Sequence, residues 1–208
     1  MAKVNIENIK LIIGLGNPGK EYEKTHHNAG FLFIDYLVAM SLRGVKRGSN
    51  PINKKIASVA FGDLAMTPLL KSDVYMNQSG NFVKAALKKY SAKGGSASGG
   101  KIKPEEILIV HDDSDIELGK YKISFGRGSA GHRGVESIIK LLGTKNFWRL
   151  RIGIRKTSRK KAGLPAEAYR VKAGELVLKK ISKKDWEILE KVFQTIFNYI
   201  RINQLYQH

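Results

Sequence analysis

Short apolar runs and amphipathic stretches alternate along this chain, with polar loops between them. Short apolar or alternating runs predict strands, and apolar residues at helical spacing predict helices. The predicted strands cover residues 10–13, 56–61, 66–70, 107–110, 121–125 and 147–154. The predicted helices cover residues 29–43, 82–90, 135–142 and 182–202. Strands that alternate with helices indicate an α/β fold.

Residues 107–110 (ILIV) are apolar without interruption, which is typical of a central strand covered on both faces. We therefore expect a central mixed, twisted sheet flanked by helices. The Gly- and Ser-rich residues 92–103 are predicted to form a flexible loop, not a domain boundary, because the central strand must pair with the first half of the chain. Residues 1–208 are predicted to form a single domain that closes with the amphipathic helix over residues 182–202.

Three polar segments follow predicted strands: residues 14–30, residues 71–81 and the acidic residues 111–115. Ligands in open α/β sheets bind at the carboxyl ends of strands. Residues 14–30 hold a Pro-Gly turn, a tyrosine, two asparagines and two adjacent histidines. We interpret this segment as the active-site loop.

The charge of the chain changes the range of expected partners. Its 37 Lys and Arg outnumber 18 Asp and Glu, which gives a net charge of +19. A polyanion, and nucleic acid before a membrane surface, is the expected partner, although a generally basic proteome would give the same composition. Residues 155–170 form one basic loop, and residues 147–154 alternate so that Arg149 and Arg151 are expected on the face away from the core.

Composition also excludes several classes of protein. There is no cysteine, so disulfides, thiolate nucleophiles and Cys-ligated zinc are ruled out. No apolar run is long enough for a membrane span, and the N-terminal residues lack the pattern of a signal peptide. We expect a cytoplasmic protein with no membrane association.

Residues 14–19 match the dinucleotide-binding pattern G-x-G-x-x-G only superficially. In that motif the glycine loop opens directly into a helix that holds the pyrophosphate. Here Pro18 and Gly19 make a turn, a polar segment follows, and Asp35 lies inside a helical pattern. We expect no nicotinamide cofactor.

His27 is the best candidate for a general base, because an imidazole titrates near neutral pH. Asp112 follows the central strand and would orient the ring if both strands end at the same edge of the sheet. Asn17 and Asn77 would supply amide donors for a carbonyl or a developing oxyanion. These residues predict a water activated by a His-Asp pair. Zinc held by His26, His27, His111 and Asp112 is the alternative, although their spacing matches no recognised zinc motif.

Five segments make the chain recognisable: GLGNPGKEYEKTHHNAGF, VYMNQSG, VHDDSD, AGHRGVESI and WRLRIGIR. In this order and spacing they resemble the bacterial peptidyl-tRNA hydrolases over roughly residues 10–178. The resemblance implies a monomeric, cofactor-free and metal-free esterase that cleaves the bond between a peptide and the 3′ ribose of tRNA.

The resemblance also implies roles for individual residues. His27 becomes the catalytic base and Asp112 the group that orients it. Asn17, Tyr22 and Asn77 become substrate-binding residues. Arg151 becomes a tRNA phosphate-binding residue.

Three positions depart from the family's pattern. His26 replaces the arginine that usually precedes the catalytic histidine. Arg133 replaces an asparagine that binds substrate in the family, and its donor capacity keeps it a candidate for substrate binding. Ser124 replaces a lysine that clamps the tRNA phosphate, so Lys122 or Arg127 is expected to substitute for it. The competing hypothesis is a non-catalytic RNA-binding relative, which would have little use for an imidazole-carboxylate pair.

Overall fold

In the computed structural model, residues 8–43, 56–59, 67–92, 101–156 and 173–205 are described, and their strands form one six-stranded sheet. The strands are β1 (Leu11–Gly14), β2 (Ile56–Val59), β3 (Thr67–Lys71), β4 (Ile107–Glu117), β5 (Tyr121–Phe125) and β6 (Trp148–Arg155). Their order across the sheet is β2-β3-β1-β4-β6-β5. The four inner strands are parallel, and the two edge strands run antiparallel to their neighbours. The predicted mixed sheet of an α/β fold is confirmed.

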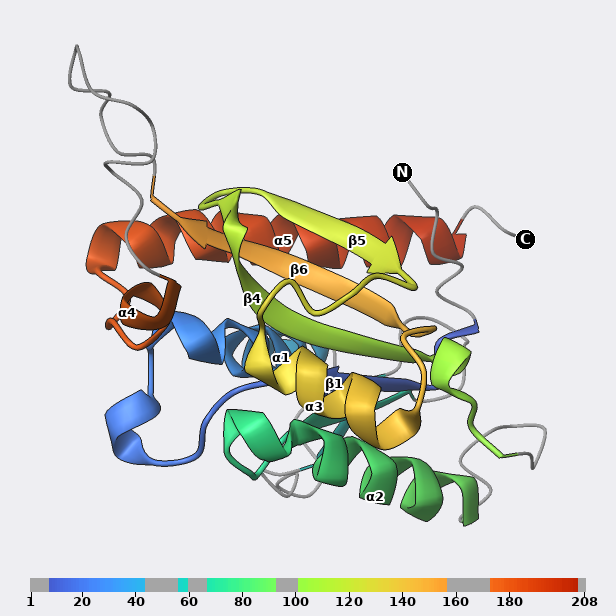
Figure 1. The fold of residues 1–208 in the computed structure, drawn as a ribbon. Coiled ribbons are helices and arrows are strands. Elements are labelled where there is room, and N and C mark those ends of the chain that lie inside the picture. The colour runs from blue at the N-terminus through green and yellow to red at the C-terminus, as the bar shows by residue number, and fades with distance from the viewer. Residues whose placement is uncertain (1–7, 44–55, 60–66, 93–100, 157–172, 206–208) are drawn as a thin grey trace.

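Helices cover both faces of this sheet (Figure 1). The α-helices are α1 (Ala29–Arg43), α2 (Ser79–Ala92), α3 (Arg133–Leu142), α4 (Ala173–Val177) and α5 (Lys183–Leu205). Within the described ranges, 3₁₀ turns cover Lys20–Tyr22, His26–Asn28, Met76–Gln78 and Pro104–Glu106. Helices α1 and α5 pack on one face, and α2 and α3 pack on the other. None of the described helices combines the length and apolar character that crossing a bilayer requires.

Alternation along the strands divides the core into two layers. In β1, Ile12 packs with Phe33 of α1 and Phe193 of α5, whereas Leu11 and Ile13 face the side of α2 and α3. The central strand β4 alternates in the same way. It therefore has cover on both faces, as its unbroken apolar run predicts.

The observed elements differ from the predicted ones mainly at their ends. Strand β4 does not end at Val110 but continues to Glu117, because it pairs with β6 through Asp113 and again at Glu117 after a register shift. Helix α2 begins at Ser79, ahead of its apolar stripe, and the short helix α4 has no counterpart in the prediction. The predicted loops at residues 92–103 and 155–170 fall largely outside the described residues.

Candidate active site

A cleft of about 820 Å³ opens where β1 and β4 deliver their polar residues. Six of the nine predicted site residues line it: Asn17, Tyr22, His27, Asn77, Asp112 and Arg133. The three predicted phosphate-binding residues do not line it: Lys122, Arg127 and Arg151. The structure therefore separates the predicted residues into a cleft and a basic surface.

His27 reaches the central strand because the start of α1 presses directly on the sheet. A Cβ atom at Gly30 would collide with the carbonyl oxygens of Val110 and Leu15, so only glycine permits this approach. The 3₁₀ turn over His26–Asn28 precedes α1 and is buried. This close packing brings His27 beside Asp112, which lies 85 positions later in the chain.

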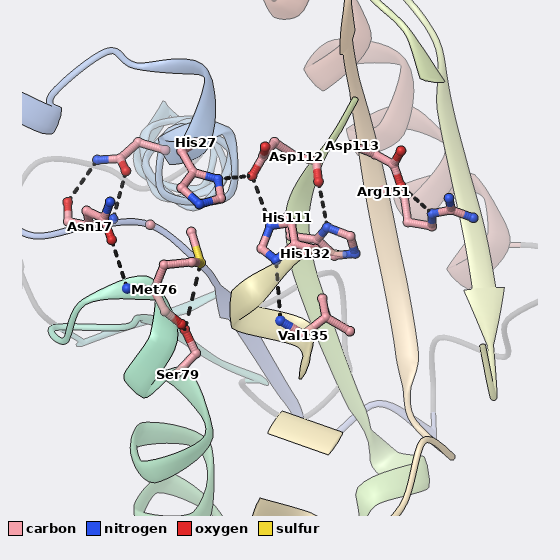
Figure 2. A network of polar contacts seen from close by, with 12 residues as sticks. Asn17, His27, Met76, Ser79, His111, Asp112, Asp113, His132, Val135 and Arg151 are labelled. Atoms are coloured by element: carbon pink, nitrogen blue, oxygen red, sulfur yellow. Dashed lines mark hydrogen bonds and ion pairs between the residues drawn. The ribbon is translucent and has the colours of Figure 1, made fainter. Parts of the chain in front are cut away.

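Asp112 is shared by two histidines (Figure 2). Its Oδ1 lies 2.8 Å from Nδ1 of His27 and 3.1 Å from Nε2 of His132. An ionised carboxylate can only accept hydrogen bonds, so both nitrogens carry hydrogen and donate it. The Nε2 atom of His27 is therefore the ring nitrogen with a free lone pair, as a general base requires.

His132 was not among the predicted site residues. It lies in the glycine-rich segment before α3, and its Nδ1 accepts a hydrogen bond of 3.3 Å from the backbone N–H of Val135. It thereby caps α3. A histidine three residues before the predicted helix was the available signal, but only the packing of α3 on the sheet brings its ring to Asp112.

Burial and hydrogen bonding shift the pKa values of Asp112 and of the neighbouring His111. Burial alone would raise the pKa of Asp112, but His27 and His132 outweigh it and hold that pKa far below its usual range. The neighbouring His111 is fully buried, and burial, with a contribution from His132, lowers its pKa well below the ordinary value. His111 Nδ1 donates to the carbonyl oxygen of Asp112 at 2.6 Å. The site thus holds an ionised Asp112 carboxylate beside a buried His111 imidazole that disfavours protonation.

The side chain of Asn17 is fixed by the backbone around it. Its Oδ1 accepts a hydrogen bond of 2.8 Å from the N–H of Met76. Asn28 holds the backbone of Asn17 through its own amide, accepting from the N–H at 2.8 Å and donating to the carbonyl at 3.0 Å. Because the oxygen of Asn17 is engaged, its NH₂ group is what the side chain offers to the cleft.

Aromatic and polar groups form the rim of the cleft. The rings of Tyr22 and Tyr75 meet edge to face with centroids 6.2 Å apart. Asn77 and Arg133 are exposed and line the cleft. Leu178, after α4, adds an exposed apolar side chain. The rim therefore offers apolar surface and hydrogen-bond donors together.

Comparisons with known proteins agree with this geometry. The family model described as peptidyl-tRNA hydrolase matches residues 11–206. The chain belongs to the peptidyl-tRNA hydrolase family.

Individual members of the peptidyl-tRNA hydrolase family are similar over most of the chain. A relative from Aquifex aeolicus named peptidyl-tRNA hydrolase is 43% identical over 154 residues, which are 73% of this chain and 72% of the relative. One from Neisseria meningitidis is 44% identical over 146 residues, 70% of each chain. A crystal structure of the peptidyl-tRNA hydrolase of Acinetobacter baumannii superposes with a TM-score of 0.69 at 29% identity and covers 96% of this chain and 90% of that one.

The basic surface of this family member lies on β5 and β6. Lys122 pairs directly opposite Arg151, and Ser124 pairs opposite Arg149, so all four share one face. Lys122 and Arg127 are exposed. The side chain of Arg151 is 20% exposed, and its Nε donates to Oδ2 of Asp113 at 2.7 Å.

Arg149 lies on the predicted face of β6, the one that also carries Arg151, but its side chain is buried there. It is 2% exposed and donates from Nη1 to the carbonyl oxygen of Gly128 at 2.9 Å. Burial, with neighbouring Arg151, lowers its pKa to about 10. Gly128 belongs to the segment between β5 and α3, so this segment lies against the guanidinium. Arg149 is therefore a buried structural residue and not part of the exposed basic surface.

The set of residues that could hold a zinc ion in the structure differs from the predicted set. Among the described residues, the ligand atoms that come within 4.8 Å of one another belong to His27, Asp112 and His132, and not to the predicted set with His26 and His111. The distances of 2.8 and 3.1 Å from nitrogen to the same carboxylate oxygen are those of hydrogen bonds. Hydrogen bonding accounts for this arrangement.

Proposed function

We propose that this chain hydrolyses peptidyl-tRNA at the ester bond between the C-terminal carboxyl group of the peptide and the 3′ ribose of tRNA. The observation that carries the proposal is the contact of 2.8 Å between His27 Nδ1 and Asp112 Oδ1. This contact leaves Nε2 of His27 able to accept a proton in a cleft large enough for a peptide terminus and a ribose.

In the proposed reaction, His27 takes a proton from water, and the resulting hydroxide attacks the ester carbonyl. The tetrahedral oxyanion accepts hydrogen bonds from the amide groups of Asn17 and Asn77. The carbon–oxygen bond to the ribose then breaks, and the proton on His27 passes to the departing ribose oxygen. Asp112 stabilises the imidazolium that forms in between. The ribose oxygen leaves more readily than the nitrogen of an amide would, so the proposal needs no metal and no cofactor.

Binding of the substrate divides between the cleft and the basic surface. Tyr22 and Arg133 are proposed to contact the substrate at the rim of the cleft. Lys122, Arg127 and Arg151 are proposed to contact tRNA phosphates, which attract Lys and Arg whatever the sequence of the nucleic acid. The net charge of +19 supports this division, because a polyanionic substrate is drawn to the whole molecule.

We propose further that the chain acts as a monomer and a single domain in the cytoplasm. The cleft is lined by elements from most of one chain, from Asn17 to Leu178, which supports a site that needs no second copy. Peptidyl-tRNA arises during translation, which supports the cytoplasm as the place of action.

The test is release of labelled peptide from peptidyl-tRNA by purified protein with a chelator present. Wild type should hydrolyse it, and His27→Ala should lose about 10²- to 10⁴-fold in kcat while keeping its affinity for tRNA. His26→Ala, with its folding verified by circular dichroism, is the neighbouring control and should keep most of the activity. Binding of tRNA without hydrolysis by wild type would favour the non-catalytic RNA-binding alternative.

A further inference from the structure

The second histidine of the site, His132, has contacts that differ in kind from those of His27. Both donate to Oδ1 of Asp112, and their ring centroids lie 5.1 Å apart. The second ring nitrogen of His132 is engaged as well, because it accepts from the N–H of Val135 at 3.3 Å. His27 therefore keeps one free lone pair, whereas His132 has none.

These contacts fix the protonation state of His132. A backbone N–H always donates, so Nδ1 of His132 must present a lone pair to Val135. Nε2 must then carry the hydrogen that faces Asp112. His132 is a neutral imidazole locked in one tautomer, and it can exchange no proton with a substrate without giving up its cap of α3.

We propose that His132 is a positioning residue, which acts through Asp112 to hold His27 in the orientation and tautomer of a base and to limit the negative charge that Asp112 presents to it. This inference rests on the proposed function. It assigns to His132 a role separate from that of the base and from the substrate contacts at the rim.

His27 and His132 share one oxygen, Oδ1 of Asp112, as their acceptor. A hydrogen bond from His132 stabilises the carboxylate and draws charge away from the side that meets His27. Without it, the same carboxylate would stabilise a protonated His27 more strongly. Loss of His132 should therefore shift proton uptake by the base to higher pH, whereas simple disorder of Asp112 would shift it to lower pH.

The other titratable groups around Asp112 leave this argument intact. His111 packs against His132 with ring centroids 4.6 Å apart, and its pKa is lowered by burial. Burial likewise lowers the pKa of His26, with Asp185 opposing and Lys156 assisting. Further charged groups lie near Asp112. Asp113 is paired with Arg151, and Arg133 is exposed at the rim.

The test uses two substitutions of His132 that differ in reach. In His132→Asn the side chain is a good helix cap but ends near the position of Nδ1, so the contact with Asp112 is lost. In His132→Gln the longer side chain can place an N–H near the position of Nε2. The measurement is kcat/KM for peptidyl-tRNA between pH 5 and pH 9, with melting temperatures to verify folding.

We expect the acidic limb of the profile to move up by about 0.5 pH unit or more in His132→Asn and to return toward wild type in His132→Gln. An unchanged or downward-shifted limb in His132→Asn, in a folded protein, overturns the inference. ¹⁵N NMR of the imidazoles gives a readout without substrate, in which wild-type His132 should carry its hydrogen on Nε2 at neutral pH. A hydrogen on Nδ1 overturns the inference too. If wild type fails to hydrolyse peptidyl-tRNA, the proposed function falls, and the NMR measurement still decides the tautomer.

Discussion

Asp113 and Arg151 form an ion pair of 2.7 Å between β4 and β6, one residue beyond the carboxylate that contacts His27. The side chain of Asp113 is 8% exposed, so Arg151 neutralises a buried charge beside the active site. Arg151 thus has a structural partner in addition to its proposed phosphate contact. Lys122 lies directly opposite on β5 and is exposed.

Because Arg151 has a buried partner and Lys122 is exposed, substitutions of these two residues should have different effects on stability. Lys122→Ala should reduce the dependence of log affinity for tRNA on log salt by about 0.7 to 0.9, the value for one phosphate contact, and leave the melting temperature unchanged. Arg151→Ala should reduce the slope similarly and also lower the melting temperature, because it leaves Asp113 unpaired. The measurements are binding at several salt concentrations and thermal unfolding. Lys191→Ala removes the same charge from α5 on the other face of the sheet, and an equal loss of slope there would contradict a localised tRNA surface.

Asp112→Asn tests the carboxylate that both histidines share. The carboxamide is uncharged, so it no longer stabilises the imidazolium of His27 during the reaction, and kcat should fall by about 10²-fold or more while KM changes little. Steady-state kinetics on peptidyl-tRNA measure both constants. Asp115→Asn changes an exposed acid three positions later and serves as the control. Wild-type turnover in Asp112→Asn would exclude the His-Asp pair.

Lys180 ties the turn that carries Tyr22 to the segment after α4. Its Nζ donates to the carbonyl oxygens of Glu21 at 2.7 Å and Glu23 at 2.6 Å, on either side of Tyr22. Lys180 itself lies two residues after Leu178, which also lines the cleft.

Lys180→Met should therefore loosen the turn that carries Tyr22. We expect KM for peptidyl-tRNA to rise roughly 3- to 10-fold, which corresponds to about 1 kcal/mol, with kcat nearly unchanged. The matched control is Lys179→Met, which removes a neighbouring exposed charge. A similar rise of KM in both variants would mean that lost charge, and not the clamp on the turn, is responsible.

His111 should make the fold sensitive to acid. Its pKa is held well below 6.5 in the folded protein, first by burial and then by His132, so the unfolded chain binds a proton that the folded protein does not. Stability therefore falls as the pH drops below the unfolded value of about 6.5, by at most about 1.4 kcal/mol per pH unit for this group.

His111→Asn should flatten this dependence, because asparagine does not titrate and can donate to the carbonyl of Asp112 in place of Nδ1. Urea unfolding between pH 5 and pH 8 measures the free energy of unfolding in both proteins. Equal slopes for variant and wild type would show that other groups, such as the buried His26, dominate the acid response.

The sequence by itself determined the elements and the class of the fold. Hydrophobic periodicity is a local property of the sequence. It is therefore visible in the order of the residues for the buried strands β1 and β4 and for the helices α1 and α3. Ligands bind at the carboxyl ends of parallel strands, and this rule was enough to predict that His27, Asp112, Asn17 and Asn77 lie in one cleft.

The tertiary structure alone decided the contacts between residues far apart in the chain. His132 became a partner of Asp112 because α3 packs on the sheet with its N-terminus at β4, and no periodicity records that approach. Arg149 and Arg151 follow one alternating pattern, yet Arg149 is covered by the segment before α3 and Arg151 is paired with Asp113. Alternation sets the face on which a side chain lies, but what covers that face depends on the path of a loop, and that path is set by the packing of the whole chain.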